Sequence, residues 1–363
     1  MLKSIILRLG LLLLVLPLPL ITIHAEKAPP KIKSNTSNRA AVSSNPFFLP
    51  LVVNSVRVIE NPPLFTTSYY WDTINATVIS EEGRLLGELM AGVPEDDYMV
   101  AILDFCQPWK DGSNYGVYLC DLGGFVPISQ IETAVKNFAI GYYTASADPS
   151  DFLTLVVGTN NYGRYVEYNH GIEWAGMVNR LNDWLVEVGF NNKIYITGGN
   201  DMELGFNSFF NTRDWINGYN SINKYPLYDF GDAQSCPTER TYKDKICTST
   251  AYGDNYTWYM SYVRQIAFGT ESNYPLPLIY NTLGTNAKQW YSLSSFSVDL
   301  YGGKMEILGA VTQWQACQTR ACPGIDNEPA KGWQQLYDEL NKDPDTAQSL
   351  LWSTDFVHNS DIP

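Results

Sequence analysis

From residue 98 to the C-terminus, short apolar runs of the strand type alternate with amphipathic segments of the helical type. A strand that is apolar on both faces must be buried on both faces, and a parallel sheet covered by helices provides that environment. Eight such runs predict an α/β fold of the closed (β/α)8 or TIM-barrel type, with an open, doubly wound sheet as the alternative. No Gly-x-Gly-x-x-Gly or Walker loop follows an early run, which argues against the nucleotide-binding version of the open sheet. The expected strands are 98–104, 138–143, 152–158, 193–197, 225–230, 276–280, 305–313 and 350–355. The expected helices are 128–136, 171–188, 256–268, 286–296 and 332–341.

The N-terminal residues have the organisation of a secretory signal. Lys3 and Arg8 precede an apolar run, and His24-Ala25 offers a cleavage position. The apolar run is short and interrupted by two prolines, so we expect a signal peptide over 1–25, with an uncleaved anchor as the alternative. A secreted or cell-envelope location follows from this assignment.

The rest of the chain divides by composition. The segment 26–50 is rich in Lys, Ser, Asn and Pro and lacks an apolar period, which predicts a disordered linker. We expect a lead-in segment with a short helix over 51–97, and the barrel over 98–363. The net charge of −14 leaves no basic field for phosphates, which argues against a nucleic-acid partner and against an anionic membrane surface. We expect a monomer.

Six cysteines in a secreted chain predict disulfide bonds. Their spacings match no common zinc pattern and no internal histidine lies near them, so we expect neither a metal nor a cofactor. On a barrel, three sequence-local pairs would follow the first, fifth and seventh expected strands and would stiffen loops at one end. The expected pairs are Cys106 with Cys120, Cys236 with Cys247, and Cys317 with Cys322.

Polar side chains stand where the expected strands end. Asp201-Met-Glu203 follows the fourth strand, and side chains two apart on an extended backbone point the same way. Two adjacent carboxylates repel, so one of them takes a raised pKa and can donate a proton. An isolated Asp-x-Glu can also be a helix cap followed by a solvated residue. The other strand ends supply Asp104, Asn160-Asn161, Asp229 with Asp232, Tyr280-Asn281, Gln313 and Asp355, and such residues can also be turn formers.

Four short motifs carry a family resemblance. The chain resembles the family-25 glycoside hydrolases, or Chalaropsis-type lysozymes, at four places. The run Ile102-Leu-Asp104-Phe-Cys-Gln107 with Trp109 resembles the segment around the family's first-strand Asp, and Asp201-Met-Glu203 resembles its fourth-strand Asp-x-Glu. Leu278-Ile-Tyr280 resembles the later strand that carries a Tyr, and Asp355 resembles the late Asp. Related barrel hydrolases, including chitinase-like ones, also carry Asp-x-Glu after strand four. The chain departs from the family because it is longer, keeps helices after strands six and seven, and has Thr312-Gln313-Trp314 where the family has Trp-Gln-Tyr.

The resemblance implies hydrolysis of a β-linked glycan of the peptidoglycan or chitin type. Glu203 would be the general acid, Asp201 would stabilise positive charge or orient an N-acetyl group, and Asp104 would tune the pair. Expected substrate contacts are Trp109, Asn161, Asp229, Tyr280, Gln313 and Asp355.

Two other functions are compatible with parts of the sequence. A barrel can keep its fold and lose catalysis, which would leave a glycan-binding or envelope-associated module. A secreted protease or esterase lacks support, because no Gly-x-Ser-x-Gly or His-Glu-x-x-His motif is present. His170 is the only internal histidine before the C-terminus, and we expect it to cap or pack a helix.

Overall fold

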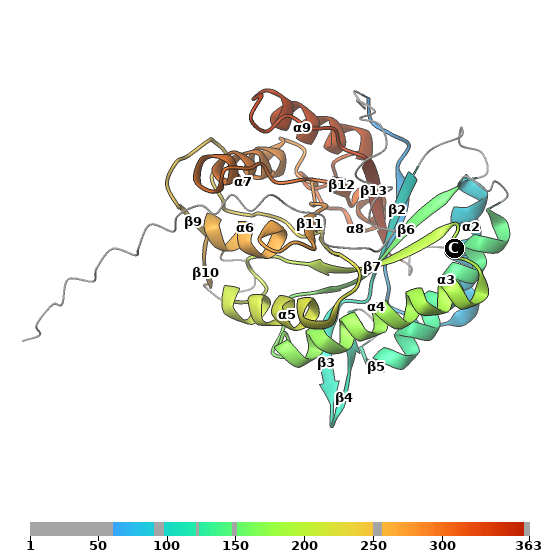
Figure 1. Cartoon of the computed structure of the whole chain (residues 1–363). Helices are drawn as coiled ribbons and strands as arrows, with labels where there is room; N and C mark the ends of the chain where they lie inside the picture. The colour runs from blue at the N-terminus through green and yellow to red at the C-terminus, as the bar shows by residue number, and fades with distance from the viewer. Residues whose placement is uncertain (1–60, 91–97, 121–122, 147–150, 250–255, 359–363) are drawn as a thin grey trace, which may run out of the picture. The chain divides into compact units, whose positions relative to one another are not determined.

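Eight parallel strands form the central sheet of the computed structural model (Figure 1). The structure describes residues 61–90, 98–120, 123–146, 151–249 and 256–358, all within the compact unit Val56–Pro363. The signal and linker predictions lie outside these residues. In the order in which they pair, the strands are β11 (Asn273–Pro275), β8 (Leu227–Asp229), β7 (Ile194–Asp201), β6 (Phe152–Asn160), β2 (Tyr98–Asp104), β1 (Thr66–Tyr70), β13 (Trp352–His358) and β12 (Gly309–Thr312).

The two outer strands of this order nearly close the sheet into a barrel. The chain just beyond β11 meets β12 through a parallel bridge between Leu278 and Val311. The amide of Ile279 donates to the Val311 carbonyl at 2.7 Å, and the Val311 amide donates to the Pro277 carbonyl at 2.9 Å. The expected strand 276–280 is therefore reduced to this bridge, with the regular strand β11 placed before it.

Helices surround the sheet, as the alternating pattern predicts. The outward side chains of β2, which include Ala101 and Leu103, belong to the core shared with the helices, whereas Ile102 and Asp104 alternate with them and face the barrel interior. The described helices are α2 (Ala76–Met90), α3 (Ile128–Ala145), α4 (Tyr168–Val188), α5 (Phe209–Ile222), α6 (Met260–Phe268), α7 (Thr285–Tyr301), α8 (Trp314–Arg320) and α9 (Pro329–Asn341).

The expected strand 138–143 is wrong, because these residues lie inside α3. Phe138, Ala139 and Tyr142 are buried on one helical face. A Cβ atom at Gly141 would lie 2.0 Å from the Ser80 carbonyl oxygen of α2, so glycine allows the two helices to touch. A short apolar run has no periodicity that separates a strand from a buried helix, which explains the error.

The first strand of the barrel, β1, was missed by the sequence analysis. Its interior residue Ser68 contacts the Thr354 hydroxyl at 2.7 Å and accepts a hydrogen bond from the Ile102 amide at 2.8 Å. A polar inner face of this kind does not produce an apolar run. The barrel therefore begins at Thr66, inside the segment expected to be a lead-in, and the strand expected first is the second.

Two insertions extend the loops after β2 and β8. The first is a three-stranded antiparallel sheet of β3 (Gln107–Asp111), β4 (Asn114–Tyr118) and β5 (Phe125–Pro127). The second is the antiparallel pair β9 (Ile246–Ser249) and β10 (Tyr256–Tyr259), so the first residues of the expected helix 256–268 are a strand.

All three expected disulfide bonds are present. Cys106–Cys120 lies in the first insertion, Cys236–Cys247 in the second, and Cys317–Cys322 after α8. They follow the second, fifth and seventh barrel strands. The first of these positions differs from the expected one because β1 precedes the strand that we had counted as first. Three disulfides indicate an extracellular or otherwise oxidising environment.

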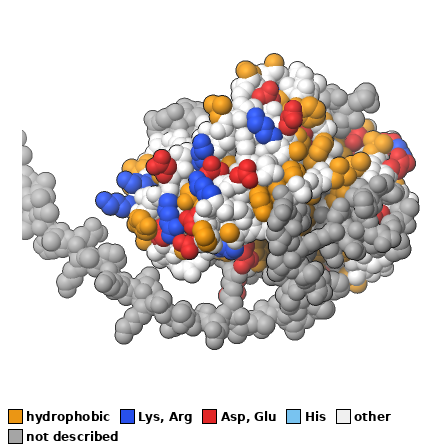
Figure 2. All heavy atoms as spheres, turned by 90° about the horizontal axis from the view of Figure 1, so that it is seen from above, with side chains coloured by type: hydrophobic (Ala, Val, Ile, Leu, Met, Phe, Trp, Pro, Cys, Tyr) orange, Lys and Arg blue, Asp and Glu red, His pale blue; other side chains and the backbone are white. Residues whose placement is uncertain are grey.

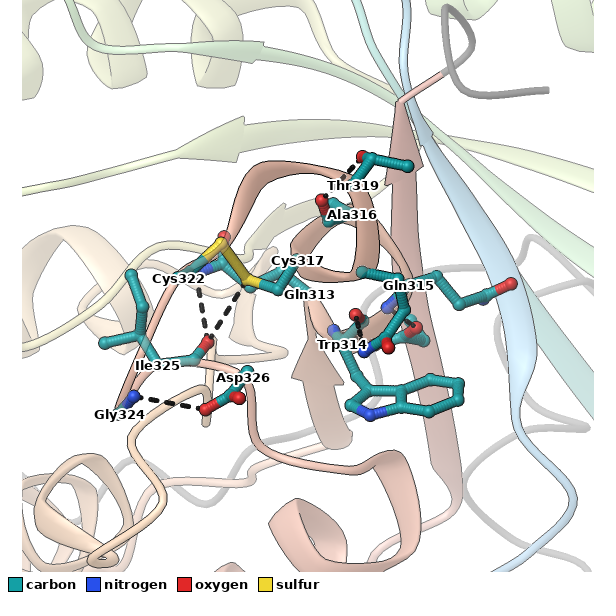
Figure 3. The surroundings of a disulfide bond; sticks show 12 residues. Gln313, Trp314, Gln315, Ala316, Cys317, Thr319, Cys322, Gly324, Ile325 and Asp326 are labelled. Carbon is teal, nitrogen blue, oxygen red and sulfur yellow. Dashed lines mark hydrogen bonds between the residues drawn. A yellow bond between two sulfur atoms is a disulfide. The ribbon is translucent and has the colours of Figure 1, made fainter.

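The disulfide bond between Cys317 and Cys322 stiffens the turn that follows α8 (Figure 3). The Cys317 sulfur lies 3.7 Å from the Ile325 carbonyl oxygen, and the Gly324 amide donates to the Asp326 carboxylate at 3.1 Å. The disulfide thus closes a turn that local hydrogen bonds also hold.

Candidate active site

The carboxyl ends of the barrel strands, here called the mouth, bring acidic side chains together. Beneath them lies Phe230, whose ring packs against two glycines. A Cβ atom at Gly158 would lie 2.7 Å from this ring, and one at Gly199 would lie 2.8 Å from it. The glycines therefore leave room for an aromatic floor, and the next inward residues after Gly199 and Ile102 are Asp201 and Asp104.

Asp201 is the centre of the cluster. Its side chain is 7% exposed, and its Oδ1 has no hydrogen-bond partner among the described residues. Burial raises the pKa of Asp201 well above its usual range, and the nearby carboxylates raise it further. We call Asp201 and the four carboxylates whose charges reach it the mouth acids: Asp104, Asp201, Glu203, Asp229 and Asp232.

Glu203 is held in place through its backbone. Its amide donates to the Asn161 Oδ1 at 3.0 Å, and the Asn161 Nδ2 donates to the Glu203 carbonyl at 3.1 Å. The same Nδ2 lies 3.1 Å from the Thr212 hydroxyl on α5. Asn161 is fully buried and clamps the Glu203 loop, so it positions the acid.

The Glu203 carboxyl is partly buried. Burial raises the pKa of Glu203 well above its usual range, with a further contribution from the charge of Asp232. Ionisation of both Asp201 and Glu203 is therefore disfavoured, because burial and neighbouring charge raise both pKa values.

Asp104 and Asp229 are buried acids with backbone partners. The Cys106 amide donates to Asp104 at 3.0 Å, and the Gly231 amide donates to Asp229 at 3.0 Å. Burial outweighs these hydrogen bonds and raises the pKa of both carboxyls to about 7. Both carboxyls therefore change charge near neutral pH.

Asp232 and Tyr280 form a hydrogen-bonded pair at the mouth. The Tyr280 hydroxyl is hydrogen-bonded to Asp232, whose other oxygen accepts the Gln234 amide at 3.0 Å. The pKa of Tyr280 is raised by burial and by the charges of Asp232, Glu203 and Asp201. Tyr280 therefore remains a neutral hydroxyl among the mouth acids.

Tyr70, at the end of β1, is a mouth residue that the sequence analysis did not single out. Its ring stacks on Phe356 at a centroid distance of 4.0 Å and lies 4.8 Å from His358. The pKa of Tyr70 is raised by burial and by the charges of Asp201 and Asp104. The Tyr69-Tyr70-Trp71 cluster was the only signal in the sequence, and finding Tyr70 required recognising β1.

The sequence analysis selected Asn161, and not Asn160, as a substrate contact. It pairs in register with Asp201 and lies on the inward face of β6, where its Oδ1 accepts the Tyr162 amide at 3.0 Å. Asn161 points the other way and clamps Glu203. Alternation along the strand separates the two roles.

Two predicted substrate contacts lie on α8 and β13 instead of projecting among the mouth acids. Asp355 is fully buried and accepts the amides of Trp314 at 2.7 Å and Gln315 at 2.8 Å, which are the first two residues of α8. Gln313 is the N-cap position of the same helix, and its Nε2 donates to the Ile325 carbonyl at 3.3 Å. The Asp355 contacts hold the start of α8 against β13.

Trp109 lies on the first insertion, beside the barrel. Its ring centroid is 5.1 Å from that of Tyr165 in an edge arrangement, and the Arg164 guanidinium lies 5.5 Å from the Trp109 ring centroid. The structure thus places Trp109 in an aromatic cluster with the loop after β6.

His170 is a structural residue, as we expected. Its Nε2 donates to the Gly116 carbonyl at 2.8 Å, and its Nδ1 accepts the Trp215 indole at 2.9 Å. Burial lowers the pKa of His170 to about 4, so the ring is neutral. It joins the first insertion to α4 and α5.

Within the described residues, none of the mouth acids forms an ion pair with a Lys or Arg side chain. The outer surface differs, because Lys and Arg side chains lie among Asp and Glu on the face shown in Figure 2. In the same residues, no three His, Cys, Asp or Glu side chains are arranged to hold a metal ion. No helix in the described part of the chain is long and apolar enough to span a membrane.

The fold and the mouth together define an α/β protein with a nearly closed parallel barrel and a cluster of buried, unneutralised carboxyls at its carboxyl end. No protein-family model matches the chain, and comparisons with curated proteins and with solved structures find no match.

Proposed function

We propose that the protein is a glycoside hydrolase that cleaves a β-linked amino-sugar glycan of the chitin or peptidoglycan type. The observation that supports this most directly is the Asp201 and Glu203 pair at the end of β7, in which burial and neighbouring charge raise the pKa of both carboxyls. Glycosidases use such a pair, in which one carboxyl donates a proton and the other stabilises positive charge on the sugar.

Glu203 is the proposed general acid. Its carboxyl is partly buried, and its backbone is held at both the amide and the carbonyl by Asn161. Its raised pKa favours the protonated form that a general acid needs, and the clamped loop holds the carboxyl for proton transfer to the glycosidic oxygen.

Asp201 is proposed to face the C2 nitrogen substituent and the developing charge on the sugar ring. Its orphan Oδ1 is an acceptor that a substrate N–H could fill. Asp104, at the end of β2, is proposed to adjust the pKa of Asp201, because the charge of ionised Asp104 raises that pKa. The Tyr280 hydroxyl, which is hydrogen-bonded to Asp232, is a further proposed substrate contact.

The test measures released reducing ends and turbidity loss on peptidoglycan, chitin and partly deacetylated chitin. The wild-type protein is compared with Glu203→Gln. We expect hydrolysis of at least one polymer by the wild type and its loss in the variant, with an unchanged melting temperature. Full activity in Glu203→Gln would remove Glu203 from the role of acid.

Absence of hydrolysis by both proteins, with retained glycan binding, would instead establish a binding module on the same barrel. Secretion through the N-terminal signal belongs to the same proposal. The three disulfides are consistent with that route, since they require an oxidising compartment.

A further inference from the structure

The charge balance at the mouth is unusual for a buried cluster. Its titratable groups come from β1, β2, β7 and the loop after it, β8 and the loop after it, the segment after β11, and β13. Among the described residues, none of these groups is a Lys or Arg. These groups are Tyr70, Asp104, Asp201, Glu203, Asp229, Asp232 and Tyr280; on β13, His358 lies beside Tyr70, and the charge of Asp355 reaches Tyr70 from outside the cluster. Buried charges in proteins are normally paired, and unpaired buried carboxyls hold protons instead, as the raised pKa values of these acids indicate; a bound cation would stabilise their ionised form.

A second observation concerns a single atom. The Asp201 side chain is more than nine-tenths buried, and its Oδ1 has no hydrogen-bond partner in the described part of the chain. Buried polar atoms nearly always have a partner, and an orphan at a site commonly marks the place of a ligand group. This oxygen lies on the inward face of β7, among the other mouth acids.

One aromatic residue, Tyr70, lies near Asp201. Tyr70 is close enough to Asp201 for that charge to affect its hydroxyl, and its ring stacks against Phe356 at 4.0 Å with His358 beside it. Phe356 stacks on the Tyr70 ring, so we expect Tyr70 to contact a bound ammonium group through its hydroxyl oxygen, which can accept a hydrogen bond.

We infer that the mouth selects a glycan with free amino groups, and that Asp201 receives the ammonium group of a glucosamine-type residue. This inference rests on the proposed glycosidase function and narrows its substrate class to the deacetylated form. An ammonium group supplies the missing positive charge and fills the orphan oxygen. A neutral N-acetyl group supplies only a hydrogen bond, and a uronic or other acidic sugar is repelled.

The experiment measures binding in the Glu203→Gln background, where no turnover interferes. Dissociation constants are determined by calorimetry for glucosamine hexamer and N-acetylglucosamine hexamer, at low and at physiological salt. The same titrations are repeated with Asp201→Asn and with Asp183→Asn, each added to Glu203→Gln. Asp183 is an exposed residue on α4, so the control makes the same change of net charge away from the mouth.

We expect the glucosamine hexamer to bind at least tenfold more tightly than the acetylated one. Asp201→Asn should abolish this preference, whereas Asp183→Asn should retain it. Equal or weaker binding of the glucosamine hexamer would overturn the inference. Loss of the preference in Asp183→Asn would also overturn it, because the effect would then come from the overall charge.

The hydrolysis assay separates this result from the proposed function. Cleavage of chitin with no preference for its deacetylated form would support the glycosidase function and contradict the proposed selectivity for free amino groups. Selective binding of the glucosamine hexamer without cleavage of any polymer would keep the ammonium site and would remove the enzyme.

Discussion

Two clusters of acids in this protein have opposite surroundings. At the mouth, the carboxyls face one another and the pKa of Asp201 is raised. Outside the barrel, the Arg240 guanidinium binds Asp299 at 2.5 Å, Asp343 at 2.7 Å and Asp345 at 3.0 Å. Burial alone would raise the pKa of Asp343, but hydrogen bonds from the Asp345 amide and from Arg240 lower it.

The difference separates structural acids from acids available for chemistry. The Arg240 cluster ties the loop after β8 to the end of α7 and to the chain after α9, so its charges stabilise the fold. The mouth acids have no such compensation within the described residues, and they reduce stability. Groups of this kind are typical of catalytic and binding sites, where perturbed pKa values serve the reaction.

The largest expected effect comes from Asp201→Asn. Removal of this charge should lower the hydrolysis rate by about 10²–10⁴-fold, the range for a lost acid–base or charge-stabilising group. It should leave the free energy of unfolding unchanged or raise it, because one buried anion disappears. Initial rates and urea melts measure both quantities. A variant that is destabilised and active would contradict the contrast between the clusters.

Arg240→Met should have the opposite profile. It leaves three carboxylates without their cation and should reduce the free energy of unfolding by about 2 kcal/mol, between the values for exposed and buried pairs. The hydrolysis rate of the folded variant should not change. Arg213→Met is the matched control, because Arg213 pairs with the adjacent Asp214 at a partly exposed position. Equal losses of unfolding free energy in both variants would show that the Arg240 cluster stabilises the fold no more than a single exposed ion pair does.

The smallest expected effect is a change in pH dependence caused by Asp104→Asn. Burial raises the pKa of Asp104 from 3.8 to about 7, so the folded state holds this proton more tightly than the unfolded state does. Stability from this group is present below pH 4 and is lost as the pH rises towards 7. Asp104→Asn should therefore raise the free energy of unfolding by about 1 kcal/mol at pH 7.5 and should have little effect at pH 4.5.

His170 changes the pH dependence of stability in the opposite direction to Asp104. Its pKa falls to about 4 in the folded state, so its contribution is complete above pH 6.5 and is lost as the pH falls towards 4. Denaturant melts across this range, with Asp183→Asn as the control for net charge, isolate the Asp104 effect. The same gain at both pH values would show that Asp104 is not held protonated by burial.

The sequence alone determined the features that depend on neighbouring residues. Strands β2, β6 and β7 and helix α4 have strong local patterns, and they lie close to the predicted positions. The cysteine pairs are close in sequence, so local spacing was sufficient for them. The position of Asp201 at a strand end followed from the same local pattern.

Only the tertiary structure decided the features that depend on distant partners. Strand β1 is a strand because it lies between β2 and β13, the latter far along the chain, and its polar inner face contains no local signal. The run 138–143 became a helix because α2 offers a face for it to pack on. The separate roles of Asn160, Asn161 and Asp355 follow from the direction in which each side chain leaves its strand. That direction is set by pairing between strands, which no single stretch of sequence contains.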